Sequence, residues 1–295
     1  MTPEPVTGAM HGEADGRDAT SGTGPAPPDV GRKRARNPVA IVKRYQTPIL
    51  WAIGLVAFIL AWWLLSIAVD KPYLPPPDAV LSALWGSFHE TTPNDPHLMQ
   101  DHIASSLSRV GWGFLIATLL AAPLGYLVGY SRILENLVGP TVELLRPIPP
   151  IAWLPFAIIF FANAQLMTAA VFIIFLGIFF PILINTVDGV KGIDKQLFDA
   201  AKSLGASRLQ IILKVIIPAS LPNMMTGMRI GIGVGWMTIV AAEMTPVLHG
   251  GLGWYIWNRA DIFRYDEMFA GMLMIGIIGL AMTQSISLIE RWLRR

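Results

Sequence analysis

The chain has no cysteine, so its 295 residues form no disulfide bond, no zinc–thiolate site and no thiol nucleophile. Charged side chains are also scarce. They make up 14% of the residues, whereas a soluble globular domain carries about 25%. The charges cluster between long uncharged apolar stretches. This layout excludes an ordinary soluble domain and indicates a chain that uses lipid as its solvent.

Several patterns that carry chemistry are absent as well. No Gly-x4-Gly-Lys-Ser/Thr sequence occurs, so the chain lacks the usual loop that cradles the phosphates of ATP. The apolar stretches hold no chain of Asp, Glu and His that would form a proton relay. The five histidines are scattered, and neither metal-ligand spacing nor the order of a catalytic triad appears. We therefore expect no enzyme, no metal site, no cofactor in this chain and no binding of nucleic acid.

What the sequence does contain is a series of apolar segments. A helix that spans a bilayer needs about 20 apolar residues, and six segments approach that length: 49–69, 111–130, 147–163, 166–187, 220–247 and 268–290. The third is short and opens with Pro147-Ile148-Pro149-Pro150, so a kinked or re-entrant helix is the alternative there. The pattern predicts an all-α polytopic membrane protein with about six transmembrane helices.

The two ends of the chain differ in composition. Residues 1–37 are rich in Gly, Pro, Ser, Thr and Asp, and such a segment cannot bury enough apolar surface to fold. We expect a disordered tail there and a membrane domain over residues 38–295. A cleaved signal peptide is excluded because the apolar run 49–69 is too long and has no small-residue cleavage site.

Lysine and arginine predict the orientation. If the six segments alternate in direction, sixteen basic residues lie on the side of the N-terminus and four on the other. Basic residues favour the cytoplasmic side of a membrane. We therefore expect both termini in the cytoplasm. Between the first two spans, residues 80–88 form an amphipathic stretch, which fits either a helix on the outer surface or packing between spans.

The most informative stretch lies between the fourth and fifth apolar segments. Asp194 is a good N-cap, and Gly205 supplies the left-handed position that ends a helix. Ser207 and Gln210 form a capping box for a second helix, and Pro218 is expected to end it before the next span. The apolar faces of the two predicted helices consist of Leu197, Phe198, Ala201 and Leu204, and of Leu209, Ile212, Leu213 and Ile216.

The same stretch resembles a known family motif. Asp199-Ala200-Ala201-x-x-x-Gly205, followed by Val215-x-Ile217-Pro218, is similar to the EAA loop of binding-protein-dependent ABC permeases, with Asp199 where glutamate is typical. In that family the loop docks into a groove on the ATPase subunit. The resemblance therefore implies a helix-turn-helix coupling loop whose contacts with the ATPase come from Asp199, Ala200, Ala201, Leu204, Gly205 and Pro218.

Further segments resemble the nitrate/sulfonate/taurine branch of this family. They are Arg146–Pro155, Arg229–Gly233 with Ala241–Met244, and the glycine-containing pieces of the second span. The resemblance implies a permease domain over residues 38–295 in the bacterial inner membrane, paired with a second copy of itself. It also implies an ATPase dimer that binds ATP and magnesium, and a periplasmic or lipid-anchored solute-binding protein.

Four residues inside the apolar segments are candidates for the substrate pathway. Glu243 is either a carboxylate at the membrane interface or a polar group at the outer end of the path. Arg229 either extends toward the cytoplasm or faces an anionic substrate. Trp153 and Trp236 either line the path or pack against helices and lipid.

The resulting hypothesis is a permease subunit of an ABC importer that moves a small anion of the sulfonate, taurine or nitrate type. An importer of another small organic solute, such as a pyrimidine vitamin precursor or an aromatic acid, is the alternative. An ion-coupled secondary transporter would show inverted repeats, and no repeat is visible in the sequence. A membrane-anchored assembly protein would not need the helix–glycine–helix loop.

Overall fold

A computed structural model describes residues 38–93, 95–162, 166–245 and 248–293. Over these residues the chain is helical, and the β-structure present is an isolated bridge between Thr92 and Asp95. The predicted all-α class is therefore confirmed. The expected tail lies outside the described residues. The chain divides into two compact units, Met1–Val56 and Ala57–Arg295, with the boundary inside α1 (Pro38–Val69), and the second unit carries the structure described below.

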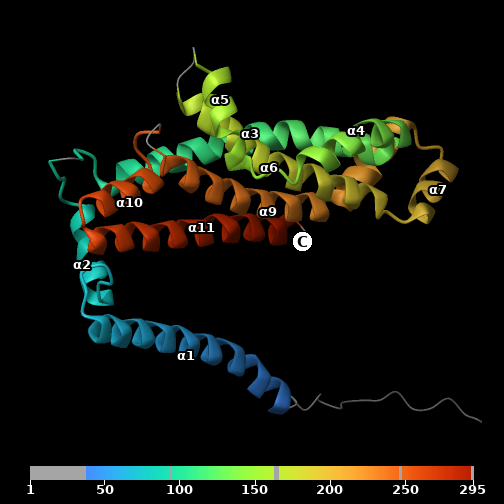
Figure 1. The fold of residues 1–295 in the computed structure, drawn as a ribbon. Helices are drawn as coiled ribbons and strands as arrows, with labels where there is room; N and C mark the ends of the chain where they lie inside the picture. The colour runs from blue at the N-terminus through green and yellow to red at the C-terminus, as the bar shows by residue number, and fades with distance from the viewer. Residues whose placement is uncertain (1–37, 94, 163–165, 246–247, 294–295) are drawn as a thin grey trace, which may run out of the picture. The chain divides into compact units, whose positions relative to one another are not determined.

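Long helices lie side by side in this second unit (Figure 1). They are α3 (Met99–Tyr130), α6 (Leu166–Lys191), α9 (Ile217–Glu243) and α11 (Tyr265–Leu293). Helix α6 is central, because it packs against both α3 and α9. Its isoleucines at 173, 174, 178 and 182 are fully buried.

Glycines let the helices on both sides approach α6 closely. A Cβ added to Gly125 of α3 would lie 2.7 Å from the Thr186 Cβ, and one added to Gly227 of α9 would lie 2.7 Å from the Pro181 carbonyl oxygen. Because lipid gives helices no hydrophobic reason to associate, this close van der Waals packing by small residues is a main source of their attraction.

The spans agree with the sequence except at the third segment. Of the residues that the structure describes, five helices are long and apolar enough to cross a membrane: Ile49–Val69, Met99–Tyr130, Met167–Lys191, Arg208–Glu243 and Tyr265–Trp292. Helix α3 begins twelve residues before the predicted start at 111. Its first turns carry polar side chains that are buried inside the protein, so hydropathy alone assigns them to a loop.

The prediction of a single helix over residues 147–163 is wrong. Instead, α4 (Arg132–Leu145), which the sequence did not predict, is followed by a 3-10 turn η1 (Pro150–Trp153) and a short α5 (Leu154–Phe160). The two parts are bent by 89°, so the kinked alternative holds, and the pair adds a sixth span if it counts as one. Four prolines between residues 147 and 155 prevent a continuous helix.

Of the shorter helices, α2 (Pro77–Ser87) and α10 (Leu252–Asp261) lie at one end of the bundle and α7 (Lys195–Ser203) at the other (Figure 1). We call the end with α2 and α10 the far end, and the end with α7 the loop end, where α8 (Arg208–Ile211) and the π-helical turn η2 (Ile212–Ile216) also lie. Helix α2 packs against α11 and buries Val80, while Leu81 and Trp85 on the same helix stay exposed. Both alternatives for this amphipathic stretch are thus partly met.

This arrangement predicts the outcome of topology mapping. Reporter fusions after Lys191, at the loop end, and after Asp261, at the far end, are expected to report opposite sides of the membrane, with Lys191 in the cytoplasm because of the basic-residue bias. A fusion after Tyr130, which ends α3 at the loop end, serves as a control and should agree with Lys191. The same side for Lys191 and Asp261 would contradict the alternation of the spans.

Candidate functional site

The helix–glycine–helix loop is formed as the sequence predicts. Asp194 caps α7 by accepting a hydrogen bond from the Gln196 backbone N–H at 2.9 Å. Gly205 has φ +77°, the left-handed conformation that ends a helix. The Gly205 N–H donates to the Lys202 backbone carbonyl, and the Ala206 N–H donates to the Ala201 backbone carbonyl. This pair of bonds is the Schellman motif, so the turn is closed by its own backbone.

The second helix begins at a complete capping box but does not end at Pro218. The Gln210 N–H donates to Ser207 Oγ at 3.3 Å, and the Ser207 N–H donates to Gln210 Oε1 at 2.8 Å. Beyond it, α8, η2 and α9 form one continuous helical run of 36 residues. The expected break before Pro218 is therefore wrong. The turn widens to i→i−5, with the Ile217 N–H bonded to the Ile212 carbonyl, directly before the proline that cannot donate.

The loop is fixed by a small core of its own. Val190, Ile211 and Ile216 are buried there, with Phe198 and Ala201 packed against them. Ile212 also packs against this core, whereas the leucines of the two predicted faces point outward: Leu204 is 88% exposed, and Leu197, Leu209 and Leu213 are exposed too. The loop therefore presents leucines that none of the described residues covers.

The sequence-predicted coupling residues lie together on this loop. Asp199, Ala200, Leu204 and Gly205 are exposed and Ala201 is half-buried. Pro218 is also exposed, at the start of α9. A Cβ on Gly205 would meet no atom of the chain within 4 Å. The glycine is thus required by its backbone conformation and not by crowding inside the subunit.

A buried polar cluster holds the far end. Glu243, the last residue of α9, is fully buried. Its carboxylate accepts hydrogen bonds from Ser106 Oγ at 2.8 and 2.9 Å, from Arg109 Nη1 at 2.6 Å and from the Gly253 N–H at 3.1 Å. Burial of this charge is tolerable because a guanidinium pairs with it and the donors satisfy its lone pairs.

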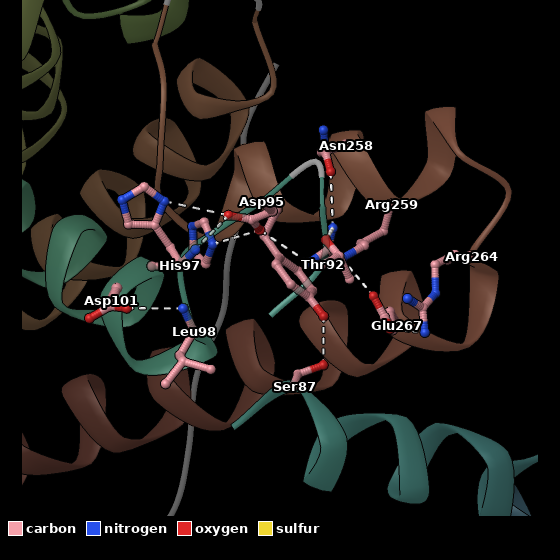
Figure 2. Close-up of polar contacts among 12 residues, drawn as sticks. Ser87, Thr92, Asp95, His97, Leu98, Asp101, Asn258, Arg259, Arg264 and Glu267 are labelled. Atoms are coloured by element: carbon pink, nitrogen blue, oxygen red, sulfur yellow. Dashed lines mark hydrogen bonds and ion pairs between the residues drawn. The ribbon is translucent and has the colours of Figure 1, made fainter. Parts of the chain in front are cut away.

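A second group of charges surrounds Asp95 (Figure 2). The Asp95 carboxylate is fully buried, 3.0 Å from His102 Nε2 and 3.1 Å from Arg259 Nη2. The Gly251 N–H donates to His102 Nδ1. Nδ1 is therefore the acceptor, and Nε2 carries the proton that is donated to Asp95.

Arg259 connects this group to α11 and α2. Its Nε lies 2.6 Å from Glu267 Oε2, and its guanidinium lies 4.6 Å above the Tyr255 ring. Burial raises the pKa of the Tyr255 phenol, so its hydroxyl stays protonated and is bonded to Ser87 Oγ at 2.7 Å. Among the described residues, no group of three His, Asp or Glu is arranged to hold a metal ion. The polar contacts of these two groups hold neighbouring helices together.

Comparison with known proteins identifies the family. Residues 113–295 match the family model described as binding-protein-dependent transport system inner membrane component. The chain belongs to this family of ABC importer permeases. It is therefore a multi-pass membrane transport protein and not itself an enzyme. The family name implies that such a permease works with a solute-binding protein and an ATPase.

Several named proteins are similar in sequence to this permease over most of its length. A putative ABC transporter permease of Methanocaldococcus jannaschii is 42% identical over 79% of this chain and 86% of its own. The taurine transport permease TauC of Escherichia coli is 36% identical over 81% and 87%, and the bicarbonate transport permease CmpB of Synechococcus elongatus is 34% identical over 82% and 88%. A structure of the MetNI methionine ABC transporter matches 66% of this chain and 95% of its own with a TM-score of 0.58 and 21% identity, which supports the fold.

Each of the four predicted pathway residues has contacts of its own within the permease. Trp236 is 5% exposed and donates to the Ile275 carbonyl of α11 at 3.1 Å. Arg229 is partly exposed, with its Nη1 3.6 Å from Glu290 Oε2. Trp153 is half-buried in η1 and its ring lies 5.9 Å from Phe156. Their part in the pathway, and that of Glu243, stays a prediction.

The sequence interpretation missed the far-end cluster, by which we mean the two groups around Glu243 and Asp95 together. Its members come from residues 92–109, 243–259 and 267, which were assigned to loops or considered singly. One signal was available: His102, Ser106 and Arg109 follow the i, i+4, i+7 spacing of a single helical face. Asp95, the partner of His102, is seven residues away, but Glu243, the partner of Ser106 and Arg109, lies more than 130 residues away, so spacing along the chain cannot identify it.

The crowding at Gly251 gives a stability prediction. Its φ is +106°, and a Cβ there would lie 2.2 Å from the Glu243 carboxyl carbon. Gly250 has φ +75°, but its nearest atom would be 3.9 Å away. Gly250→Ala should therefore cost about 1–2 kcal/mol of backbone strain, and Gly251→Ala should cost roughly 1–3 kcal/mol more from overpacking. Thermal unfolding of the detergent-solubilised variants measures the difference, and equal melting temperatures would contradict the packing of Glu243 against this loop.

Proposed function

We propose that this permease is one half of the membrane channel of an importer for small oxyanions, driven by an ATPase that docks on the α7–α8 loop. The observation that carries the proposal is the loop itself. Its caps and its small core fix its shape without any partner, and it projects Leu204 almost fully exposed. A rigid, exposed apolar side chain is a typical anchor for a pocket on a partner protein.

The energy source follows from what the chain lacks. It has no phosphate-cradling sequence, so ATP and magnesium would bind to the ATPase subunits. Nucleotide-driven motion would then reach the membrane through Asp199, Ala200, Ala201, Leu204 and Gly205 on the loop and through Pro218 at the start of α9. Because basic residues accumulate at the loop end, we place this end and both termini in the cytoplasm.

A second copy would complete the pathway. Each of the four candidate residues has separate contacts within one subunit, and α5 projects from the bundle (Figure 1). Phe156, Ile159 and Phe160 on α5 are exposed. A homodimer would cover this apolar projection and bring two sets of residues to one axis. A periplasmic or lipid-anchored solute-binding protein would deliver the substrate at the far end.

The substrate class rests on the relatives. Their names include taurine, bicarbonate and nitrate transport permeases, and sulfonate, bicarbonate and nitrate are all small oxyanions. Arg229 and Trp153 are the pathway candidates with partly free surfaces, whereas Trp236 and Glu243 are occupied by partners within the subunit. A guanidinium suits an oxyanion because it offers paired donors in one plane.

Docking can be tested at Leu204. Leu204→Ser should reduce co-purification of the ATPase at least several-fold, because it removes an exposed apolar contact and no contact within the chain. Gly205→Val should act in the same direction by straining the turn, by about 1–2 kcal/mol, and Asp199→Ala should have a milder effect. Leu81→Ser is the matched control, an exposed leucine at the far end. Normal ATPase binding by the Leu204 and Gly205 variants would refute docking on this loop.

The pathway can be tested at Arg229. We expect Arg229→Gln to lower uptake of the transported anion at least ten-fold while the complex with the ATPase assembles normally, and Arg229→Lys to keep part of the activity because it keeps the charge. Uptake of radiolabelled taurine, nitrate and bicarbonate into vesicles that contain the binding protein is the measurement. If Arg229→Gln transports as well as the natural chain, Arg229 contributes only its contact with Glu290.

A further inference from the structure

The two ends of α9 differ in how firmly they are held. At the far end, Glu243 is fixed by hydrogen bonds from α3 and from Gly253 of α10. Moving this end of α9 away from α3 would separate the buried carboxylate from Arg109, and an unpaired buried charge is strongly unfavourable. The carboxylate occupies the space that a Cβ on Gly251 would fill, so it is packed closely against this turn. The far end is therefore clamped.

The loop end has the opposite character. Between Ile212 and Ile216 the helix is a π-turn, and Pro218 and Pro222 each lack a backbone donor. Side-chain hydroxyls occupy neighbouring carbonyls: Ser220 Oγ donates to the Ile216 carbonyl at 2.6 Å, and Thr226 Oγ donates to the Pro222 carbonyl at 3.1 Å. A helix that lacks backbone bonds and contains a widened turn bends more easily than a regular one.

The packing divides at the same place. Residues of α7, α8 and η2 share the small core around Val190, Ile211 and Ile216. From Met225 onward, the buried apolar side chains of α9 belong to the large core with α3 and α6. The small core rests on the end of α6 at Val190 and shares Tyr126 of α3 with the large core, so the run from α8 to α9 changes its packing partners across the segment with weakened bonding.

We infer that α9 works as a lever whose joint is the π-turn Ile212–Ile216 and whose fixed pivot is the Arg109–Glu243 pair. Motion delivered to α7 and α8 displaces the loop end, while α3 and α9 keep their spacing at the far end. Arg109 and Glu243 are then positioning residues for transport, because they determine where the helices separate, and Glu243 has this role in place of the pathway role considered above. This inference rests on the proposed importer function.

Spin-label distances test the lever directly. The natural chain has no cysteine, so cysteine pairs can be introduced without removing any. The pair Tyr130→Cys with Lys214→Cys joins α3 to η2 at the loop end, and Ser108→Cys with Ala241→Cys joins α3 to α9 at the far end; all four sites are exposed. Labelled chains are diluted with unlabelled natural chains in the ATPase complex, and distances are recorded without nucleotide and with trapped ATP.

The lever predicts that the main distance of the loop-end pair shifts between these two states and that the distance of the far-end pair does not. A far-end shift as large as the loop-end shift would overturn the pivot, and an unchanged loop-end distance would overturn the joint. Failure of the natural chain to bind the ATPase would instead refute the proposed function, which separates the two failures.

Substitutions at the pivot supply a second test. Glu243→Gln and Arg109→Gln each leave one charge unpaired, and each should lower transport per ATP hydrolysed several-fold in the assembled complex. The double variant removes both charges and should recover part of that coupling. Uptake is measured with radiolabelled taurine, nitrate or bicarbonate, whichever the natural chain transports. If Arg109 and Glu243 have a purely structural role, their variants should form less complex, but the complex that forms should transport normally per ATP hydrolysed. That result would overturn the inference. If one single variant fails to assemble, the other single variant and the double variant still give this measurement.

Discussion

Close contact between helix backbones is the constraint on which the rest of the bundle depends. Helices in lipid gain little from apolar burial and associate through packing and hydrogen bonds. Here the isoleucine-rich α6 lies between glycines from two sides: Gly113 of α3 would clash with Ile174, and Gly235 of α9 with Ile178, if either carried a Cβ. Such contacts set the spacing of α3 and α9, and that spacing places Ser106 and Arg109 within reach of Glu243.

The far-end cluster shows how a membrane helix can carry charge at low cost. Breaking a buried pair by removing one partner costs about 3–5 kcal/mol, although the intact pair adds little stability. The cluster is therefore better understood as fixing relative positions than as a source of net stability. His102 and Glu243 bind neighbouring parts of one glycine-rich turn, through the N–H groups of Gly251 and Gly253. A single arrangement of α3, α9 and α10 satisfies both groups.

Features determined by neighbouring residues were predictable, and features determined by distant partners were not. The caps at Asp194 and Ser207 and the left-handed Gly205 follow from local sequence, and each is present. The start of α3 was misplaced because its polar face is buried by partners from α9 and α10, which hydropathy does not register. Pro218 was expected to stop a helix, but its cost depends on the carbonyl four residues earlier, and a widened turn moves that carbonyl away.

The length of the α8–η2–α9 run connects these observations to transport. Thirty-six residues form a rod of about 54 Å, while the apolar part of a bilayer is about 30 Å thick. If Glu243 lies near one face of the membrane, the first turns of the rod extend beyond the other. The surface that bears Leu209 and Leu213 and the buried Glu243 are then parts of one continuous helix, with no flexible linker between them to absorb motion. In the proposed lever, displacement of the loop reaches the membrane through the part of this rod that is weakened by the π-turn and by Pro218 and Pro222.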